Sequence, residues 1–530
     1  MTYYVDSAAL PGGDGSRERP FFTISSAAAI AQPGSLILVS PGVYREHVNP
    51  AFGGTADAPI IYRSEQPGQA VITGAERADN WEHYQGNTWK AVFPNRLFGN
   101  FNPYQEQVTG DWYYGSRVVH TGEVYLDEGS LYEAETLEEV LLGDRWAGAW
   151  PLNRGEDLTA CRWYAQVGEE ATVIFANFGG RNPKEHCIEI NVRRNCFFPS
   201  QTGRNYITLD GFTVCRSACT WAPPTAFQDG MIGAHWSKGW VIENCEIFQA
   251  RCSGISIGKY LQPGNENKWS NHAKKSGTQN ERDVICRAVN EGWDKETVGS
   301  HIIRNCHIHD CGQTGIVGHL GCAFSLIENN HIHHINNKQE LDGAEIGGIK
   351  LHAAIDTVIR RNHIHHCTRG LWLDWQAQGT RVTQNLFHHN TPPDSAKIIY
   401  HLEMGEDIFV EVSHGPTLID NNLLLSDHAA RLSTQGVAMV HNLICGSFTK
   451  VGTGTDNGGL PRYTPYHVPH GTKINGFMTF LHGDMRFYNN IFLQQGVRFC
   501  FDEDMKSLNI DLNKYTGTFV YDEYPDPEEY

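Results

Sequence analysis

Four short apolar stretches of this chain each end on an ionisable side chain, in order His319, His352, Asp374 and Glu411. Each is followed, ten or eleven positions later, by an asparagine inside a second apolar stretch: Asn330, Asn362, Asn385 and Asn422. Two carboxylates in line can act as nucleophile and as general acid or base at an acetal carbon. Two adjacent carboxylates repel each other, and such a pair is more common where it has a function than elsewhere. This column of four residues is therefore the candidate reactive site.

The spacing is typical of a coil whose successive turns stack on one another. The second stretch recurs eight times, and its fourth position is always a cysteine or an asparagine: Cys245, Cys306, Asn330, Asn362, Asn385, Asn422, Asn442 and Asn490. Stacked asparagines can bond amide to amide along the axis of such a coil. The sequence therefore predicts an all-β protein, a right-handed parallel β-helix, in which the asparagines form a structural ladder.

The coil also predicts where the two carboxylates lie. Because neighbouring turns are roughly 4.8 Å apart, Asp374 and Glu411 are expected side by side, facing solvent from one sheet. Carboxyl groups about 5–5.5 Å apart leave no space for a water molecule and favour retention of configuration, whereas inverting pairs lie about 6.5–9.5 Å apart. Mutual repulsion and the nearby Trp372 or Trp375 are expected to keep one carboxyl protonated and its neighbour ionised.

Other polar and aromatic residues accompany the carboxylates. His319 and His352 precede Asp374 on the same strand face, and Lys350 and Glu345 lie just before His352. An exposed strand histidine often has no binding role, but here the side chains are placed to bond sugar hydroxyls. The residues predicted to bind substrate are Glu345, Lys350, His352, His319, Trp372 and Trp375.

Three histidine pairs form a separate group: His307 with His309, His331 with His333, and His363 with His365. A separation of two residues puts both imidazoles of a pair on one strand face, so metal binding is one alternative. We favour a solvated outer face opposite the core residues Ile308, Ile332 and Ile364, and we predict neither a metal site nor a cofactor.

The repeat divides the chain into three regions. Residues 1–79 are expected to form the N-terminal part of the helix, residues 80–195 an inserted domain, and residues 196–530 the main helix with its groove. The inserted region predicts a small antiparallel β-sandwich, because it contains four apolar runs separated by turn residues. These runs cover residues 88–93, 117–127, 163–167 and 171–176.

Two long insertions interrupt the main helix at residues 259–300 and 446–484. The first contains an amphipathic pattern that predicts a short helix near residues 280–293. Long loops in compact domains commonly form walls or lids. We therefore expect both insertions, together with the inserted domain, to close the groove into a pocket.

The composition agrees with one long all-β coil. The chain has 530 residues, 54 of them glycine, and a solenoid can exceed the usual domain size because it grows in one dimension. Its formal net charge of −18 argues against nucleic-acid or anionic-membrane partners and disfavours a polyanionic substrate. Its 14 cysteines are expected to be reduced and buried. Since we recognise neither a secretory signal nor a membrane-spanning run, we expect a cytoplasmic location.

Two phrases are specific enough to compare with known families. Residues 370–382 read Gly-Leu-Trp-Leu-Asp-Trp-Gln-Ala-Gln-Gly-Thr-Arg-Val, and residues 407–416 read Asp-Ile-Phe-Val-Glu-Val-Ser-His-Gly-Pro. With the inserted domain and residues 347–352, they resemble the β-xylosidases of glycoside hydrolase family 120 over nearly the whole chain. The resemblance implies that Asp374 is the nucleophile and Glu411 the general acid/base. A longer loop at residues 390–406 adds Glu403 and Glu406 as further carboxylates, which leaves the acid/base assignment open.

The resemblance and the paired carboxylates together predict a retaining β-xylosidase. Its expected partner is a short β-xylo-oligosaccharide, from whose non-reducing end it releases xylose, and a homo-oligomer is compatible with the sequence. A β-helix polysaccharide lyase is an alternative, but it would need a basic catalytic residue and a Ca²⁺ ion or a basic groove. A non-catalytic carbohydrate-binding solenoid is another, and it would not need the carboxylates.

Overall fold

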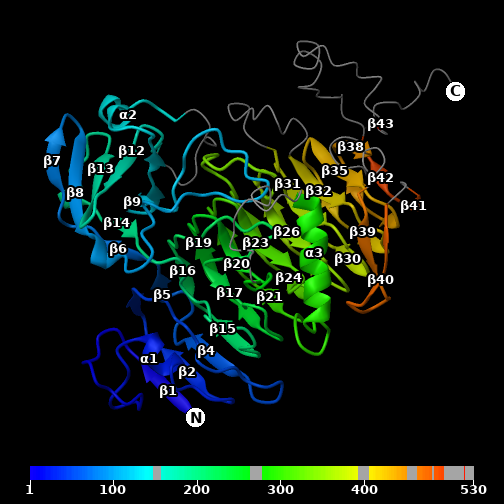
Figure 1. Cartoon of the computed structure of the whole chain (residues 1–530), viewed down its shortest axis with the longest axis horizontal. Helices are drawn as coiled ribbons and strands as arrows, with labels where there is room; N and C mark the ends of the chain where they lie inside the picture. The colour runs from blue at the N-terminus through cyan, green and yellow to red at the C-terminus, as the bar shows by residue number, and fades with distance from the viewer. Residues whose placement is uncertain are drawn as a thin grey trace.

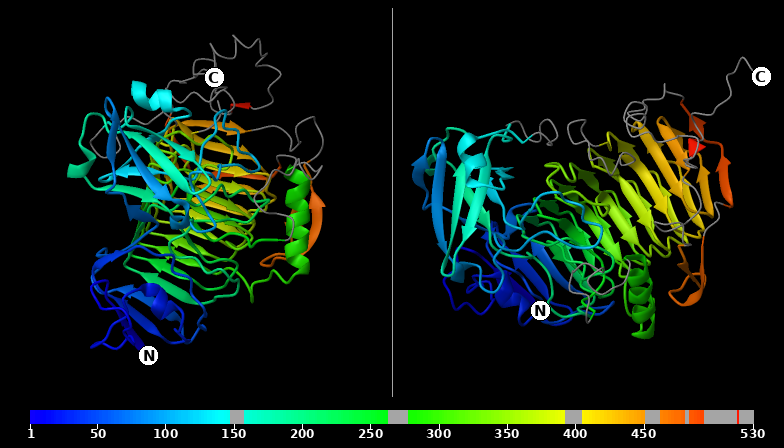
Figure 2. Two further views of the ribbon diagram at one scale, coloured as in Figure 1. Left: turned by 60° about the vertical axis from the view of Figure 1, so that its left-hand side comes forward. Right: turned by 45° about the horizontal axis from the view of Figure 1, so that its top comes forward.

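The computed structural model describes residues 1–146, 157–262, 277–391, 405–450, 462–479, 483–493 and 518–519. Its main body is a coil of parallel strands stacked into three long sheets (Figure 1). A smaller body of mostly antiparallel strands lies beside the N-terminal half of the coil, and one long helix stands along the flank of the coil (Figure 2). The predicted parallel β-helix is therefore confirmed.

Each full turn of the coil gives one strand to each of the three sheets. The first sheet contains β1 (Thr2–Val5), β2 (Leu36–Val39), β4 (Ile60–Ser64), β15 (Ile207–Asp210), β18 (Val241–Glu243), β21 (Ile302–Arg304), β24 (Leu326–Glu328), β27 (Val358–Arg360), β30 (Thr380–Thr383), β33 (Thr417–Asp420), β36 (Val437–Val440) and β41 (Met485–Tyr488).

The second sheet contains β3 (Gly42–Tyr44), β5 (Ala70–Thr73), β16 (Thr213–Cys215), β19 (Glu246–Phe248), β22 (His307–His309), β25 (His331–His333), β28 (His363–His365), β31 (Leu386–His388), β34 (Leu423–Leu424), β37 (Leu443–Ile444) and β42 (Ile491–Phe492).

The third sheet contains β17 (Ile232–Gly233), β20 (Ser253–Ser256), β23 (Thr314–His319), β26 (Gly347–His352), β29 (Leu371–Asp374), β32 (Glu406–Glu411), β35 (His428–Ser433), β38 (Ser447–Lys450) and β43 (Thr518–Phe519). Its strands pair in parallel from β17 to β38, and β43 pairs with β38 in the antiparallel direction.

The core is built from the middle residues of these short strands. In the first sheet, Ile327, Ile359 and Val382 stack on one another and are completely buried. Neighbouring strand residues point outward because side chains alternate along a strand. Each buried aliphatic side chain contributes roughly 1.5–3 kcal/mol, so the repeated middle position stabilises every turn.

The asparagines form the predicted ladder at the turn between the first and second sheets. Asn362 Nδ2 donates to Asn385 Oδ1 at 3.0 Å, and Asn385 Nδ2 donates to Asn422 Oδ1 at 2.9 Å. The residue before each asparagine has a left-handed backbone, with φ of 56° at Arg361 and 58° at Gln384. This conformation is unfavourable for residues other than glycine, and the stacked amides offset its cost.

The smaller body consists of two sheets. One contains β6 (Ala75–Arg77), β9 (Val124–Leu126), β10 (Gly129–Ser130) and β14 (Ile188–Asn191), and the other contains β7 (Glu82–Gln85), β8 (Thr88–Pro94), β11 (Tyr132–Glu133), β12 (Arg162–Val167) and β13 (Ala171–Asn177). They enclose a hydrophobic core of their own. The domain boundaries at residues 79/80 and 195/196 stay a prediction.

One predicted strand in this body is mostly wrong. Of residues 117–127, only β9 is a strand. His120 lies upstream of β9 and is bonded by a side chain instead. Its backbone N–H donates to one carboxylate oxygen of Glu133 at 2.9 Å, and its Nδ1 lies 2.6 Å from the other. A side chain thus satisfies a backbone group that a strand would have paired with a neighbour.

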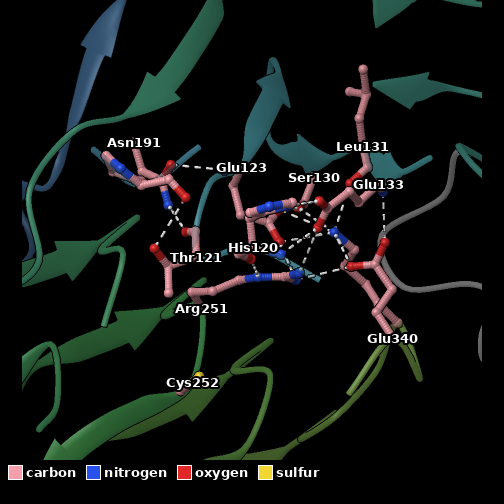
Figure 3. A network of polar contacts seen from close by, with 12 residues as sticks. His120, Thr121, Glu123, Ser130, Leu131, Glu133, Asn191, Arg251, Cys252 and Glu340 are labelled. Atoms are coloured by element: carbon pink, nitrogen blue, oxygen red, sulfur yellow. Dashed lines mark hydrogen bonds and ion pairs between the residues drawn. The ribbon is translucent and has the colours of Figure 1, made fainter. Parts of the chain in front are cut away.

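A buried ionic network joins the smaller body to the coil (Figure 3). Arg251, between β19 and β20 of the coil, bonds Glu123 at 2.5 Å and Glu340 at 2.9 Å, and lies 3.3 Å from Glu133. Lys338 bonds Glu123 at 3.0 Å. Because such buried charges are costly when separated, the network fixes how the smaller body meets the coil.

Helix α3 (Gly277–Asn290) occupies the first long insertion and confirms the predicted helix with a small shift. Its apolar residues Val284 and Ala288 pack with Leu320 and Ala353, which immediately follow β23 and β26. The remaining elements are α1 (Ile24–Ala28), α2 (Leu137–Leu142), the 3₁₀ turns η1 (Asn95–Leu97) and η2 (Pro183–Glu185), and the hairpin β39 (Thr464–His467) and β40 (Ile474–Met478).

The described cysteines are free thiols, and all of them except Cys187 and Cys286 are buried. They act as small apolar core residues, as predicted. None of the described helices has the length and apolar character that a membrane crossing requires.

Candidate active site

Four ionisable residues occupy equivalent positions on neighbouring strands of the third sheet. The strand register pairs His319 with His352, His352 with Asp374, and Asp374 with Glu411. Since adjacent parallel strands lie roughly 4.8 Å apart, the two carboxylates are direct neighbours. The repeat spacing therefore predicted the order and register of this column correctly.

The column is not open to solvent, and that part of the sequence prediction is wrong. His319 is completely buried, His352 and Asp374 are 3% and 5% exposed, and Glu411 is partly exposed. Helix α3 packs beside the ends of β23 and β26, its Glu281 lies against His319, and Arg462 lies against Glu411. A bare β-helix would have left the same side chains in water.

Lys350 lies at the centre of the buried cluster and is itself completely buried. Its Nζ is 2.5 Å from Asp374 Oδ2, 2.9 Å from His352 Nε2 and 3.3 Å from Glu345 Oε2. Asp374 Oδ1 is also buried but has no hydrogen-bond partner among the described residues. One oxygen of Asp374 is thus fixed by an ammonium, while the other is available to a reacting atom.

The charges around Lys350 shift two neighbouring groups. Burial alone would raise the pKa of the Glu345 carboxyl, but Lys350 and His352 outweigh burial and hold that pKa below its ordinary value. Burial and Lys350 lower the pKa of His352, but Asp374 and Glu345 overcome both, so that pKa lies above its ordinary value. Glu345 is therefore ionised at neutral pH, and His352 carries a larger share of positive charge.

Helix α3 adds Glu281, a carboxylate that the sequence reasoning missed. Its Oε1 is 3.0 Å from His319 Nε2 and 3.8 Å from His352 Nδ1. Burial raises the pKa of Glu281, but His319 and His352 more than compensate, so the pKa is lowered. His319 Nδ1 is 2.7 Å from the carbonyl oxygen of Pro224. His319 Nε2 therefore faces the Glu281 carboxylate, while burial holds the pKa of His319 below its ordinary value.

Glu411 lines the pocket together with Arg462 and Tyr114, which come from distant segments. Arg462 donates from its guanidinium to Glu411 Oε1 at 2.8 Å. Tyr114 belongs to the smaller body; burial raises its pKa to about 12, and the charges of Glu345 and Glu411 add to the rise. Tyr114 is therefore a neutral hydroxyl at any physiological pH.

Two tryptophans flank Asp374. The Trp372 ring stacks on Phe409 with a centroid separation of 5.0 Å, and Lys350 Nζ lies 3.3 Å from the ring centre. The backbone N–H of Trp375 donates to the carbonyl oxygen of Glu411 at 2.9 Å. The aromatic rings thus hold the ammonium and tie together the two turns that carry the carboxylates.

These residues surround a pocket of about 200 Å³, which is lined by Trp112, Tyr114, Thr278, Glu281, Ala344, Glu345, His352, Trp372, Asp374, Trp375, Glu411 and Arg462. It is smaller than the roughly 300–1,000 Å³ of pockets that hold drug-sized ligands, and its size suits one sugar ring. Among the residues predicted to bind substrate, Lys350 and His319 lie behind the lining. Trp112, Tyr114, Thr278 and Arg462 were missed, because they lie in segments outside the repeat.

The extra carboxylates of the longer loop have different positions. Glu406 begins β32 and is completely buried, and it accepts a hydrogen bond from Arg369 at 2.7 Å. It does not line the pocket. Glu403 lies outside the described residues.

The pocket also contains donor atoms of the kind that bind metals. One oxygen or nitrogen from each of Glu345, His352 and Asp374 lies within 4.8 Å of the other two. The Lys350 ammonium is within 3.3 Å of all three residues. It supplies the positive charge that a cation would bring to that position, so these residues do not fit a metal centre.

Comparison with known proteins identifies the two parts of the fold. Residues 78–190 match the family "Glycoside hydrolase 120, insertion domain", and residues 289–442 match "Right handed beta helix region". The handedness predicted from the sequence is thus confirmed. Residues 78–190 cover the smaller body from β7 to all but the last residue of β14, and leave out β6.

The solved structure described as "The complex structure of XylC with xylose" is similar over 94% of this chain and 76% of that chain, with 44% identity and a TM-score of 0.86. A structure described as "Glycoside hydrolase" covers 96% of this chain and 98% of that chain with a TM-score of 0.51, but only 12% identity, so it supports the fold alone. The uncharacterized protein YwoF of Bacillus subtilis (strain 168) is 29% identical over 76 residues, which span 14% of this chain and 16% of that protein.

The match to XylC covers 94% of this chain, at an identity well above the level at which only a fold is shared. Together with the insertion-domain match, it shows that the chain is a glycoside hydrolase and belongs to family 120.

Proposed function

We propose that this enzyme is a retaining β-xylosidase that releases xylose from the non-reducing end of short β-xylo-oligosaccharides. The observation that carries the proposal is the pairing of Asp374 with Glu411 on adjacent strands, with one oxygen of Asp374 fixed and the other unbonded. The xylose in the related XylC structure supports the choice of sugar.

In the first step, Glu411 donates a proton to the glycosidic oxygen while Asp374 Oδ1 attacks the anomeric carbon, which gives a covalent glycosyl-enzyme and frees the leaving alcohol. Lys350 remains on Oδ2 and orients the attacking oxygen. In the second step, ionised Glu411 takes a proton from water, which attacks the same carbon and releases xylose with its original configuration.

The pocket walls support attack at a chain end. Tyr114 comes from the smaller body, Glu281 from α3 and Arg462 from the second long insertion, and all three line a space suited to one sugar ring. The ionised carboxyls of Glu281 and Glu345 are suited to accept hydrogen bonds from sugar hydroxyls. A site closed in this way favours removal of terminal residues over cutting within a polymer.

A lyase mechanism fits these residues less well. The buried Lys350 is paired with two carboxylates and with His352, so it cannot readily act as the base that a lyase requires. The free, mostly buried thiols fit a reducing compartment, and we propose a cytoplasmic location. Homo-oligomerisation stays a prediction.

The roles of the two carboxylates are separated by replacing each with alanine. We expect Asp374→Ala to abolish hydrolysis of every xyloside, because no glycosyl-enzyme can form. Glu411→Ala should lose activity on xylo-oligosaccharides but still react with aryl xylosides whose leaving group needs no proton. Added azide should then restore turnover of Glu411→Ala and give β-xylosyl azide.

The matched control is Glu403→Ala, which should retain activity without azide. NMR of the wild-type reaction should show the β-anomer of xylose first. An α-anomer as the first product, an α-azide, or loss of activity at Glu403 with normal activity of Glu411→Ala would contradict the assignment. An early fall in the viscosity of polymeric xylan would contradict exo attack, and inactivity on all β-xylosides would exclude the substrate.

A further inference from the structure

Ten histidines form an ordered array on the second sheet and the turn that follows it. They stand in three columns: His307, His331 and His363; His309, His333, His365 and His388; and His334, His366 and His389. Within each column, neighbouring rings stack nearly parallel with centroid separations between 4.7 and 5.1 Å. The third sheet carries the catalytic column, so this array lies on a different sheet.

The ring nitrogens of neighbouring columns meet in short pairs. His307 Nε2 is 2.7 Å from His333 Nε2, and His333 Nδ1 is 2.6 Å from His334 Nδ1. A neutral imidazole has one N–H and one lone pair, so each short N···N contact is one hydrogen bond between neutral rings. The same pattern recurs one turn later, where His331 Nε2 is 2.8 Å from His365 Nε2.

Three sets of histidines bring three nitrogen atoms within 4.8 Å of one another: His307, His331 and His333; His331, His363 and His365; and His365, His366 and His388. Tetrahedral Zn²⁺ with Zn–N distances of about 2.0–2.1 Å requires nitrogens about 3.3 Å apart. Each set would become three ligands if its rings rotated to bring the nitrogens to that spacing. The rings are partly exposed, so an ion and a water ligand can reach them.

We propose that this histidine array binds Zn²⁺, with His307, His331 and His333 as one ligand set and His365, His366 and His388 as a second. Imidazole is a preferred ligand of Zn²⁺ and of its neighbours Cu²⁺ and Ni²⁺. The two sets share no residue, so up to two ions bind per chain. This departs from the sequence prediction, which favoured a solvated face without a metal.

In known zinc sites the second ring nitrogen of a ligand is held by another polar group, and polar groups lie near the second nitrogens of two members of the first set. His333 Nδ1 is within hydrogen-bond distance of His334, and His307 Nδ1 lies 3.7 Å from the Glu246 carboxylate. His309 is also near that carboxylate, with Nε2 at 3.4 Å. The bound ion would clamp successive turns of the coil.

The test uses the full-length chain without a histidine tag. Titration calorimetry with ZnCl₂ should show saturable binding, and the metal retained after dialysis should be one or two ions per chain. X-ray absorption should show imidazole nitrogens at about 2.0–2.1 Å. No retained Zn²⁺, or a first shell of oxygen alone, would overturn the proposal.

The variant His331→Gln/His365→Gln removes a member of all three sets and should weaken Zn²⁺ binding at least tenfold. The control His441→Gln lies outside the array, at a left-handed position whose equivalents one and two turns earlier in the ladder are Asn421 and Gln384. It should bind Zn²⁺ as the wild type does. Unchanged xyloside hydrolysis in both variants without metal would show that they fold. Wild-type affinity in the double variant would refute the assignment, whatever the outcome for the xylosidase activity.

Discussion

Replacing Lys350 with methionine removes the buried ammonium between Asp374 and Glu345. At an effective dielectric constant of about 20, the attraction is roughly 7 kcal/mol for Asp374 at 2.5 Å and roughly 5 kcal/mol for Glu345 at 3.3 Å. Most of this compensates the desolvation of the buried charges. Since removal of one partner of a buried ion pair costs about 3–5 kcal/mol, we expect Lys350→Met to lose that much folding stability at high pH.

The loss should depend on pH because His352 can replace part of the missing charge. Its Nε2 is 3.3 Å from Asp374 Oδ2, and Lys350 holds its pKa down in the wild type. In the variant, that pKa rises further above the unfolded value. A raised histidine pKa adds stability that is fully present below about pH 6.5 and is lost as the pH rises through the folded pKa. The deficit should therefore be smaller at pH 5.5 than at pH 9.

The measurement is guanidinium unfolding followed by tryptophan fluorescence at both pH values, with kcat/KM on an aryl xyloside. Activity should fall by about 10²-fold if Asp374 moves by about 1 Å. The matched control is Lys259→Met, at another completely buried lysine, which donates to the Thr225 carbonyl oxygen at 3.3 Å. At pH 9 it should lose about 1 kcal/mol or less, so it controls for the size of the loss at pH 9 and not for its pH dependence. Wild-type stability of Lys350→Met at pH 9, or a larger deficit at pH 5.5, would refute the reasoning.

Two further predictions follow from charges beside the pocket. Arg462→Met removes the guanidinium that donates to Glu411 Oε1 at 2.8 Å. It should lower kcat/KM on xylo-oligosaccharides more than on aryl xylosides that need no proton, because the acid/base carboxyl is then held less firmly in place. An equal loss on both substrates would show that Arg462 does not position the acid. Burial lowers the pKa of Lys259 to about 7. Between about pH 7 and 10.5 the unfolded chain therefore binds a proton that the folded chain lacks. Because of this difference, the stability of the wild type should rise with pH relative to that of Lys259→Met. A constant difference between the two proteins from pH 7 to 10 would contradict this.

The sequence could predict the coil and the catalytic register because both are local and repeated. A period of two along each strand determines which side chains point inward, and the ladder asparagines mark the same turn in each repeat. Asp374 and Glu411 could therefore be placed on adjacent strands without a structure, and the strand register confirms that placement.

The burial of the site could not be predicted, because it depends on contacts between segments far apart in the sequence. Glu281 reaches His319 only because the apolar face of α3 packs beside Leu320 and Ala353. Arg462 reaches Glu411 from a segment with no repeat. One signal in the sequence could have revealed Glu281. A carboxylate on the apolar side of an inserted helix needs a buried cation or imidazole as its partner.

The same pairing explains how a chain with a formal net charge of −18 can bind a neutral sugar in a pocket rich in acids. Four carboxyl groups line the pocket, from Glu281, Glu345, Asp374 and Glu411. Lys350, Arg462 and the imidazole of His352 offset three of these charges when His352 is protonated, and a protonated Glu411 removes the fourth. In the state poised for the first step the pocket is thus close to neutral, so it neither requires a cation nor attracts a polyanion. The insertions that close the pocket also supply Glu281 and Arg462, so the walls that shape the pocket also help to set its charge.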